Sequence, residues 1–252
     1  MKQVQKHYLS LALSLGGGAA GLALRFWLLR GRDADGLLPR WHPAGIALTA
    51  LSALVLVLLF LLTREPKSAC GKYYYVNFPA SPLGGGCALL AAAVLFAQVL
   101  GSLIGKPGAL GTVCDFLGLG AVFSLAFTGC CRIQRRRPNF LFHLIICLYF
   151  TVSLIARYRV WSANPQISQY ACELLASVCL MLTAYHRAAF DLNQGSRSAL
   201  RLLSLAGGYF SILCLCGTNR LFYAAMAAWL FTGLCVPALP EGEPDAPAET
   251  DG

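Results

Sequence analysis

The sequence predicts an all-helical protein, a polytopic bundle of about eight transmembrane helices. The 252-residue chain is 57% hydrophobic and only 12% charged, whereas a soluble domain carries about 25% charged residues. Its apolar residues gather in stretches of about the 20 residues that a helix needs to cross a bilayer. Only two carboxylates, Asp115 and Glu173, fall within these stretches. The chain is therefore expected to reside in a lipid bilayer.

The apolar stretches follow one another with short connections, which leaves too little chain for a separate soluble domain. They cover residues 8–29, 43–63, 83–104, 108–129, 140–156, 168–186, 202–216 and 220–236. We interpret each stretch as one membrane span of a single bundle, residues 1–236.

The first stretch also has features of a secretory signal. Lys2 and Lys6 precede an apolar run and a group of small residues, which is the order found in cleaved leaders. Apolar sequence resumes at once from Leu22 to Leu29. This favours a retained helix that anchors the chain, and cleavage is the alternative.

The connection before the third stretch is rich in aromatic residues, from Tyr73 to Phe78. Aromatic side chains at a helix entry are typical of the membrane interface, and a re-entrant loop is the alternative. Glycines such as Gly84 to Gly86 begin the third stretch. They predict close helix packing, because apolar burial alone does not drive helices together in lipid.

A weak internal repeat relates the two halves of the chain. Segments 40–64 and 159–187 share the order Arg, Trp, Pro, apolar stretch, Arg, with an offset of about 120 residues. In both halves a basic loop then leads to a stretch that contains a glycine cluster. This predicts a 4+4 tandem repeat of units 1–130 and 131–236 in the same orientation, as in parallel-repeat transporters. Chance similarity between apolar segments is the alternative.

The distribution of lysine and arginine predicts the orientation. The N-terminus and the connections on its side carry more of these bases than the other connections, and cytoplasmic loops carry the excess. The protein is therefore expected in a cell or inner membrane, with both termini on the cytoplasmic side. Residues 237–252 contain acids, prolines and no base, and are expected to form a disordered acidic tail.

The local signatures of several enzyme classes are missing. The sequence contains no G-x-x-x-x-G-K-[ST], H-E-x-x-H or G-x-S-x-G. The absence of these motifs favours a non-enzyme without excluding an enzyme.

The net charge of +9 comes from bases at the ends of spans. We interpret these bases as determinants of membrane topology and expect no nucleic-acid partner. Most of the 11 cysteines lie in apolar stretches and lack zinc spacing. We expect no metal and no cofactor.

Asp115, Glu173 and Arg25 are expected at similar depth, near the outer ends of their helices. An ionisable group in the hydrocarbon core costs several kcal/mol unless it is paired or hydrated. Arg25 can pair with either acid in a buried salt bridge. We hypothesise an outward-facing polar cavity in which one acid binds a cation or a proton. The alternative is that these acids hold helices together or reach interfacial water.

Bases also gather at the expected cytoplasmic ends of three spans. This patch comprises Arg132, Arg135, Arg136, Arg137, His143, His186 and Arg187. It can attract anionic lipid head groups or phosphates, although bases here also set topology. A histidine that acts as acid or base needs a partner carboxylate, and Asp191 is the only acid nearby in the sequence.

Three functional classes agree with these observations. The leading hypothesis is a permease for a small molecule or an ion such as a cation, alone or as the membrane subunit of a transporter, with its ligand in a polar cavity. The first alternative is a non-catalytic membrane protein that assembles with a membrane partner or with copies of itself through a small-residue face. The second is a lipid-modifying enzyme, which needs His, Asp or Ser residues that converge at one interface.

Overall fold

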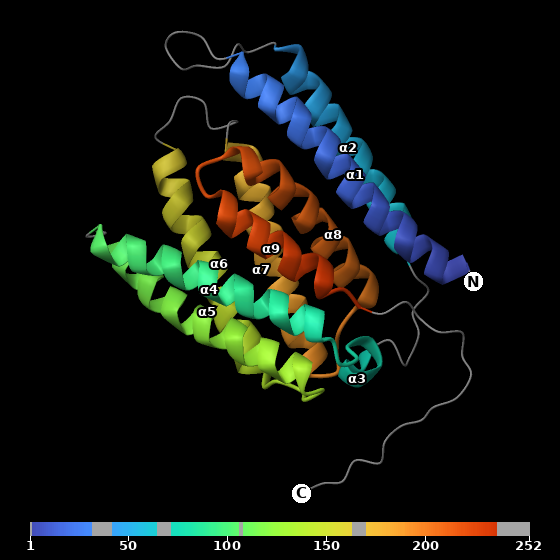
Figure 1. Cartoon of the computed structure of the whole chain (residues 1–252), viewed down its shortest axis with the longest axis vertical. Coiled ribbons are helices and arrows are strands. Elements are labelled where there is room, and N and C mark those ends of the chain that lie inside the picture. The colour runs from blue at the N-terminus through green and yellow to red at the C-terminus, as the bar shows by residue number, and fades with distance from the viewer. Residues whose placement is uncertain (1, 32–41, 65–71, 106–107, 163–169, 236–252) are drawn as a thin grey trace, which may run out of the picture.

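Every regular element in the described part of the chain is a helix (Figure 1), which confirms the all-helical fold class. The computed structural model describes residues 2–31, 42–64, 72–105, 108–162 and 170–235. The acidic tail lies outside the described residues. The elements are α1 (Lys2–Arg30), α2 (Pro43–Thr63), α3 (Tyr74–Asn77), α4 (Pro82–Ile104), α5 (Ala109–Ile133), α6 (Phe140–Trp161), α7 (Ala171–Asp191), α8 (Arg197–Leu213), η3 (Cys214–Cys216) and α9 (Arg220–Thr232).

Six of the described helices are long and apolar enough to cross a membrane: α1, α2, α4, α5, α6, and α8 with η3. They are the helices of an integral, multi-pass membrane protein. α7 is too polar for this group because it carries Glu173, Arg187 and Asp191, and α9 has only 13 residues, or about 20 Å of helix. Eight spans and the 4+4 repeat therefore stay predictions.

α8 lies between the α1–α2 hairpin and α9 (Figure 1) and is the most buried of the six apolar helices. Within its most apolar window 67% of the residues are buried, against 17% to 28% in the other five apolar helices. The α1–α2 hairpin packs on one side of α8, while α7 and α9 pack on other sides. Six helices, α4 to α9, form a closed ring. α7, α8 and α9 pack in that order, and the α4–α5 hairpin closes the ring because α4 contacts α9 and α5 contacts α6, which contacts α7.

Local sequence sets the start of the helices that surround one end of the bundle. Pro82 occupies the first turn of α4, where its missing N–H is not needed. Ser81 accepts a hydrogen bond from the backbone N–H of Gly84 (3.0 Å), and Asn139 caps α6 in the same way. The backbone N–H of Ser81 also donates to the carbonyl of Arg132 (3.3 Å), which ties the start of α4 to the last turn of α5.

Two glycines allow α4 and α5 to cross closely. A Cβ on Gly85 would lie 2.6 Å from the carbonyl oxygen of Gly129 and would collide with the side chain of Ile133. A Cβ on Gly129 would lie 3.0 Å from the carbonyl oxygen of Gly85. Gly86 is the next residue along α4, and a Cβ there meets nothing within 4 Å. Gly85 and Gly129 therefore support the expected glycine packing, whereas Gly86 plays no part in it.

We expect Gly85→Ala to destabilise the bundle by about 1–3 kcal/mol, because the added methyl group overpacks the α4–α5 crossing. Gly86→Ala is the matched control and is expected to be neutral or stabilising, since alanine is favoured over glycine in a helix by up to about 1 kcal/mol. Thermal unfolding of the detergent-solubilised protein measures both. Equal unfolding temperatures for the two variants would contradict the close crossing.

Candidate functional site

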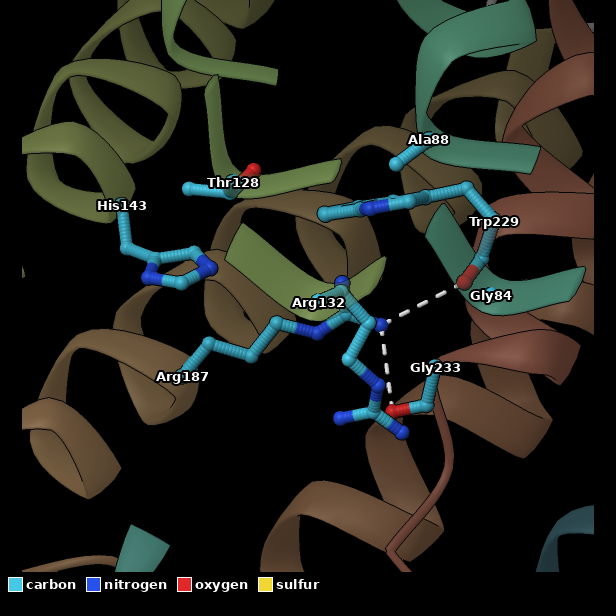
Figure 2. Close-up of a pocket in the computed structure, with 8 residues that line it drawn as sticks. All are labelled: Gly84, Ala88, Thr128, Arg132, His143, Arg187, Trp229 and Gly233. Carbon is cyan, nitrogen blue, oxygen red and sulfur yellow. Dashed lines mark hydrogen bonds between the residues drawn. The ribbon is translucent and has the colours of Figure 1, made fainter. Parts of the chain in front are cut away.

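A small polar cavity lies among α4, α5, α6, α7 and α9, at the end of the bundle where α4 and α6 begin (Figure 2). Its volume is about 40 Å³, and it is lined by Gly84, Ala88, Thr128, Arg132, His143, Arg187, Trp229 and Gly233. A cavity needs only about 10–15 Å³ of such volume to hold one water molecule. The site therefore has room for a small polar group beside two guanidinium groups and an imidazole.

Arg187 is the most constrained of the lining side chains. It is buried, and one of its terminal nitrogens donates to the carbonyl oxygens of Trp229 and Gly233, each at 3.3 Å. Its guanidinium lies 4.0 Å over the Trp229 ring, within cation–π range. A Cβ on Gly233 would collide with this guanidinium and would lie 2.8 Å from the carbonyl oxygen of Trp229, so the site favours glycine here. Among the described residues, no carboxylate lies within 4.0 Å of Arg187.

Arg132 reaches the cavity from α5. Its guanidinium lies 4.8 Å over the Phe78 ring and hydrogen-bonds the Tyr74 side chain. Burial raises the pKa of Tyr74 to about 12 and the pKa of the neighbouring Cys235 thiol to about 12. Both groups are therefore neutral at pH 7, and neither offsets the charge of Arg132 or Arg187.

His143 and Asp191 form a buried pair at the edge of the cavity. His143 Nδ1 lies 2.6 Å from Asp191 Oδ2, and the two side chains are 7% and 0% exposed. The second carboxylate oxygen of Asp191 is buried without a hydrogen-bond partner. The pair is neutral overall when His143 is protonated, and carries one negative charge when His143 is neutral. With the two arginines included, the cavity has a net positive charge in either state.

The structure brings together three members of the expected basic patch and separates the other four. Arg132, His143 and Arg187 line the cavity. Arg135, Arg136 and Arg137 are exposed in the turn after α5, and His186 is half-buried with its ring against Tyr185. The exposed arginines follow the end of α5, so their side chains extend past the bundle rather than into it.

The three residues expected to share an outer site are divided in the same way. Arg25 lies 3.8 Å from Glu173 and donates to the carbonyl oxygen of Leu213 (3.1 Å). Asp115 instead accepts a hydrogen bond from Ser102 (2.9 Å) and makes no ion pair among the described residues. The reason is helix order, since Asp115 lies on α5, which packs on α4 and α6, whereas Arg25 lies on α1, which packs on α2 and α8.

A second cavity, of about 360 Å³, opens between the end of α2 and the start of α8. It is lined by Phe60, Thr63, Arg64, Ser198, Ala199 and Leu202, so it contains one charged side chain and no buried polar cluster. Neither of these two cavities is lined by Asp115, Glu173 or Arg25. No group of three or more potential metal ligands occurs among the described residues.

Sequence reasoning placed Asp191 near the basic patch but missed Trp229 and Gly233. Helical spacing is the signal that connects them. Arg187 and Asp191 are four residues apart on α7, and Trp229 and Gly233 are four apart at the end of α9, so each pair shares one helix face. Nothing in the sequence indicates that these two faces meet.

Comparison of the chain with protein-family models, with curated proteins and with solved structures finds no match. The chemistry of the site therefore rests on its geometry. Two guanidinium groups with few counter-charges can bind an oxyanion. A carboxylate-bound imidazole beside them can accept or release a proton.

We expect Arg25→Met to destabilise the protein by about 1–3 kcal/mol, because it leaves the Leu213 carbonyl without its buried donor and the Glu173 carboxylate without its counter-charge. Arg30→Met is the control on the same helix. Arg30 is exposed, and its replacement is expected to change stability by about 0.5 kcal/mol or less.

The double variant Arg25→Met with Glu173→Gln is expected to recover part of the lost stability, since it leaves no unpaired charge. Thermal unfolding in detergent measures the unmodified protein, Arg25→Met, Glu173→Gln and the double variant. Strict additivity of the two substitutions would show that Arg25 and Glu173 do not interact.

Proposed function

We propose that this chain is a multi-pass membrane protein that binds a phosphate-type oxyanion in the cavity formed by Arg132, Arg187 and His143. The bound group is a free tetrahedral anion or the phosphate of a lipid head group. We place this cavity at the cytoplasmic end of the bundle, with both termini on that side. This assignment follows the excess of lysine and arginine there.

The observation that carries the proposal is the buried guanidinium of Arg187. Moving a charged group out of water is unfavourable unless a partner compensates it. The described contacts of Arg187 are two backbone carbonyls and an aromatic face. Asp191 acts on its charge from beyond 4.0 Å and is already paired with His143. An oxyanion in the adjoining cavity supplies the counter-charge and accepts hydrogen bonds from both arginines.

This site favours a ligand-handling protein over a purely structural one. A permease needs a binding site among its helices, and a cavity lined by two guanidinium groups offers one. We therefore retain the permease, with an anion rather than a cation as its ligand. The lipid-modifying enzyme is a second candidate, because His143 and Asp191 adjoin the same cavity.

We expect sodium sulfate or phosphate to raise the unfolding temperature of the purified protein, because a ligand that binds the folded state stabilises it. Arg187→Gln is expected to raise the Kd for sulfate about 10- to 100-fold, which corresponds to the loss of a charged hydrogen bond worth about 1.5–3 kcal/mol. Arg220→Gln is the matched control, since Arg220 is exposed and bonds only Gly217 among the described residues.

The source of the anion is tested in nanodiscs of phosphatidylcholine with and without phosphatidic acid. Competition between phosphatidic acid and sulfate would identify a lipid head group, and unchanged sulfate binding would identify a free anion. The absence of binding to sulfate, phosphate and phosphatidic acid would contradict the proposed function.

A further inference from the structure

We propose that the cavity takes up its anion together with one proton, and that His143 carries this proton. The inference rests on the proposed function, since it concerns the same site. In this proposal the two arginines bind the anion, and the His143–Asp191 pair binds the proton.

The geometry places His143 between its carboxylate and the arginines. Asp191 occupies Nδ1 at 2.6 Å, and His143 also lines the cavity. Figure 2 shows the far nitrogen of the ring turned toward the middle of the cavity, on the side of the arginine side chains. One nitrogen therefore contacts a fixed negative charge, and the other faces the place where the anion is proposed to bind.

The charged and titratable groups around this pair come from each element that packs there. They are Tyr74 of α3, Cys130, Cys131 and Arg132 of α5, Arg136 after α5, Arg187 and Asp191 of α7, Arg197 and Arg201 of α8, and Cys235 after α9. α4 and α9 contribute only uncharged residues to the cavity wall. The cavity wall therefore carries the two guanidinium groups of Arg132 and Arg187, with the carboxylate of Asp191 beside it. Arg136, Arg197 and Arg201 add positive charge around it.

This balance couples the proton to the anion. In the empty cavity a protonated His143 is repelled by Arg132 and Arg187, and Asp191 offsets only one positive charge. A divalent anion adds two negative charges beside the ring, so it favours the protonated form. By thermodynamic reciprocity the proton then strengthens anion binding by the same factor. A permease built on this site would move the anion and the proton in the same direction.

The experiment uses sulfate as the probe, because sulfate remains divalent from pH 5 to 8 and its own titration does not interfere. The full-length protein in phosphatidylcholine nanodiscs is titrated by calorimetry across this range. We expect the Kd to rise with pH, approaching about tenfold per pH unit where His143 is neutral in the free protein. Titration in weak buffer with a pH indicator is expected to show uptake of about one proton per sulfate at that end of the range.

Two variants and a control locate the proton. His143→Gln is expected to bind sulfate with a Kd that is independent of pH. Asp191→Asn is expected to retain binding and to move the pH dependence to lower pH, because an amide does not balance the imidazolium charge. His186→Gln is the matched control, since His186 lies on α7 without lining the cavity, and it should behave as the unmodified protein.

The possible failures of the two proposals are separable. Sulfate binding that is independent of pH in the unmodified protein would overturn the proton-linked inference and leave the anion site intact. An unchanged pH dependence in His143→Gln would do the same. If His143→Gln does not fold, Asp191→Asn provides the test. A Kd for sulfate that depends on pH in Asp191→Asn as it does in the unmodified protein would overturn the inference. Failure to bind sulfate at any pH, together with unchanged stability in phosphate and phosphatidic acid, would overturn the proposed function itself.

Discussion

A buried guanidinium group requires a partner, and in this bundle Arg25 and Arg187 both use backbone carbonyls at the end of a helix. The last carbonyls of an α-helix lack intrahelical donors and carry a partial negative charge. Arg25 donates to the carbonyl of Leu213, where α8 ends, and Arg187 donates to the carbonyls of Trp229 and Gly233, where α9 ends. An arginine therefore donates to each helix end; at α9 it bonds the carbonyl of Gly233 and is a second donor to that of Trp229, which also accepts from the N–H of Gly233. The helix end in turn stabilises the positive charge.

α7 carries charged residues near both of its ends and packs between α6 and α8. α7 carries Glu173 and Arg187, one near each end, and its buried face runs from Ala176 to Asp191. Its partner α8 is mostly buried, and α9 joins the two to the α4–α5 hairpin. The apolar helices α1, α2, α4 and α5 expose large hydrophobic side chains such as Leu54, Phe60 and Phe116, as expected for surfaces that face lipid. The lipid-facing helices also contribute polar groups, but Arg25 of α1 and Asp115 of α5 are buried against neighbouring helices.

The two arginines differ in what completes their charge balance. Arg25 has Glu173 at 3.8 Å, so its charge is offset within the chain and its role is to hold α1, α7 and α8 together. Arg187 has no carboxylate within 4.0 Å among the described residues, and Arg132 adds a second positive charge at the same cavity. The two buried arginines therefore differ in counter-charge rather than in burial.

The sequence by itself determined the fold class and the position of the main helices, because hydropathy and local capping by residues such as Ser81 and Asn139 act within a few residues of the chain. It also determined that Arg132, His143 and Arg187 lie at one end, since each closely follows or precedes the end of an apolar stretch. Only the tertiary structure decided that Arg25 pairs with Glu173 while Asp115 bonds Ser102, and that Trp229 and Gly233 meet Arg187. These contacts depend on which helices are neighbours and on how each is rotated about its axis. Packing between helices sets both the neighbours and the rotation of each helix, and neither can be predicted from apolar stretches of similar composition.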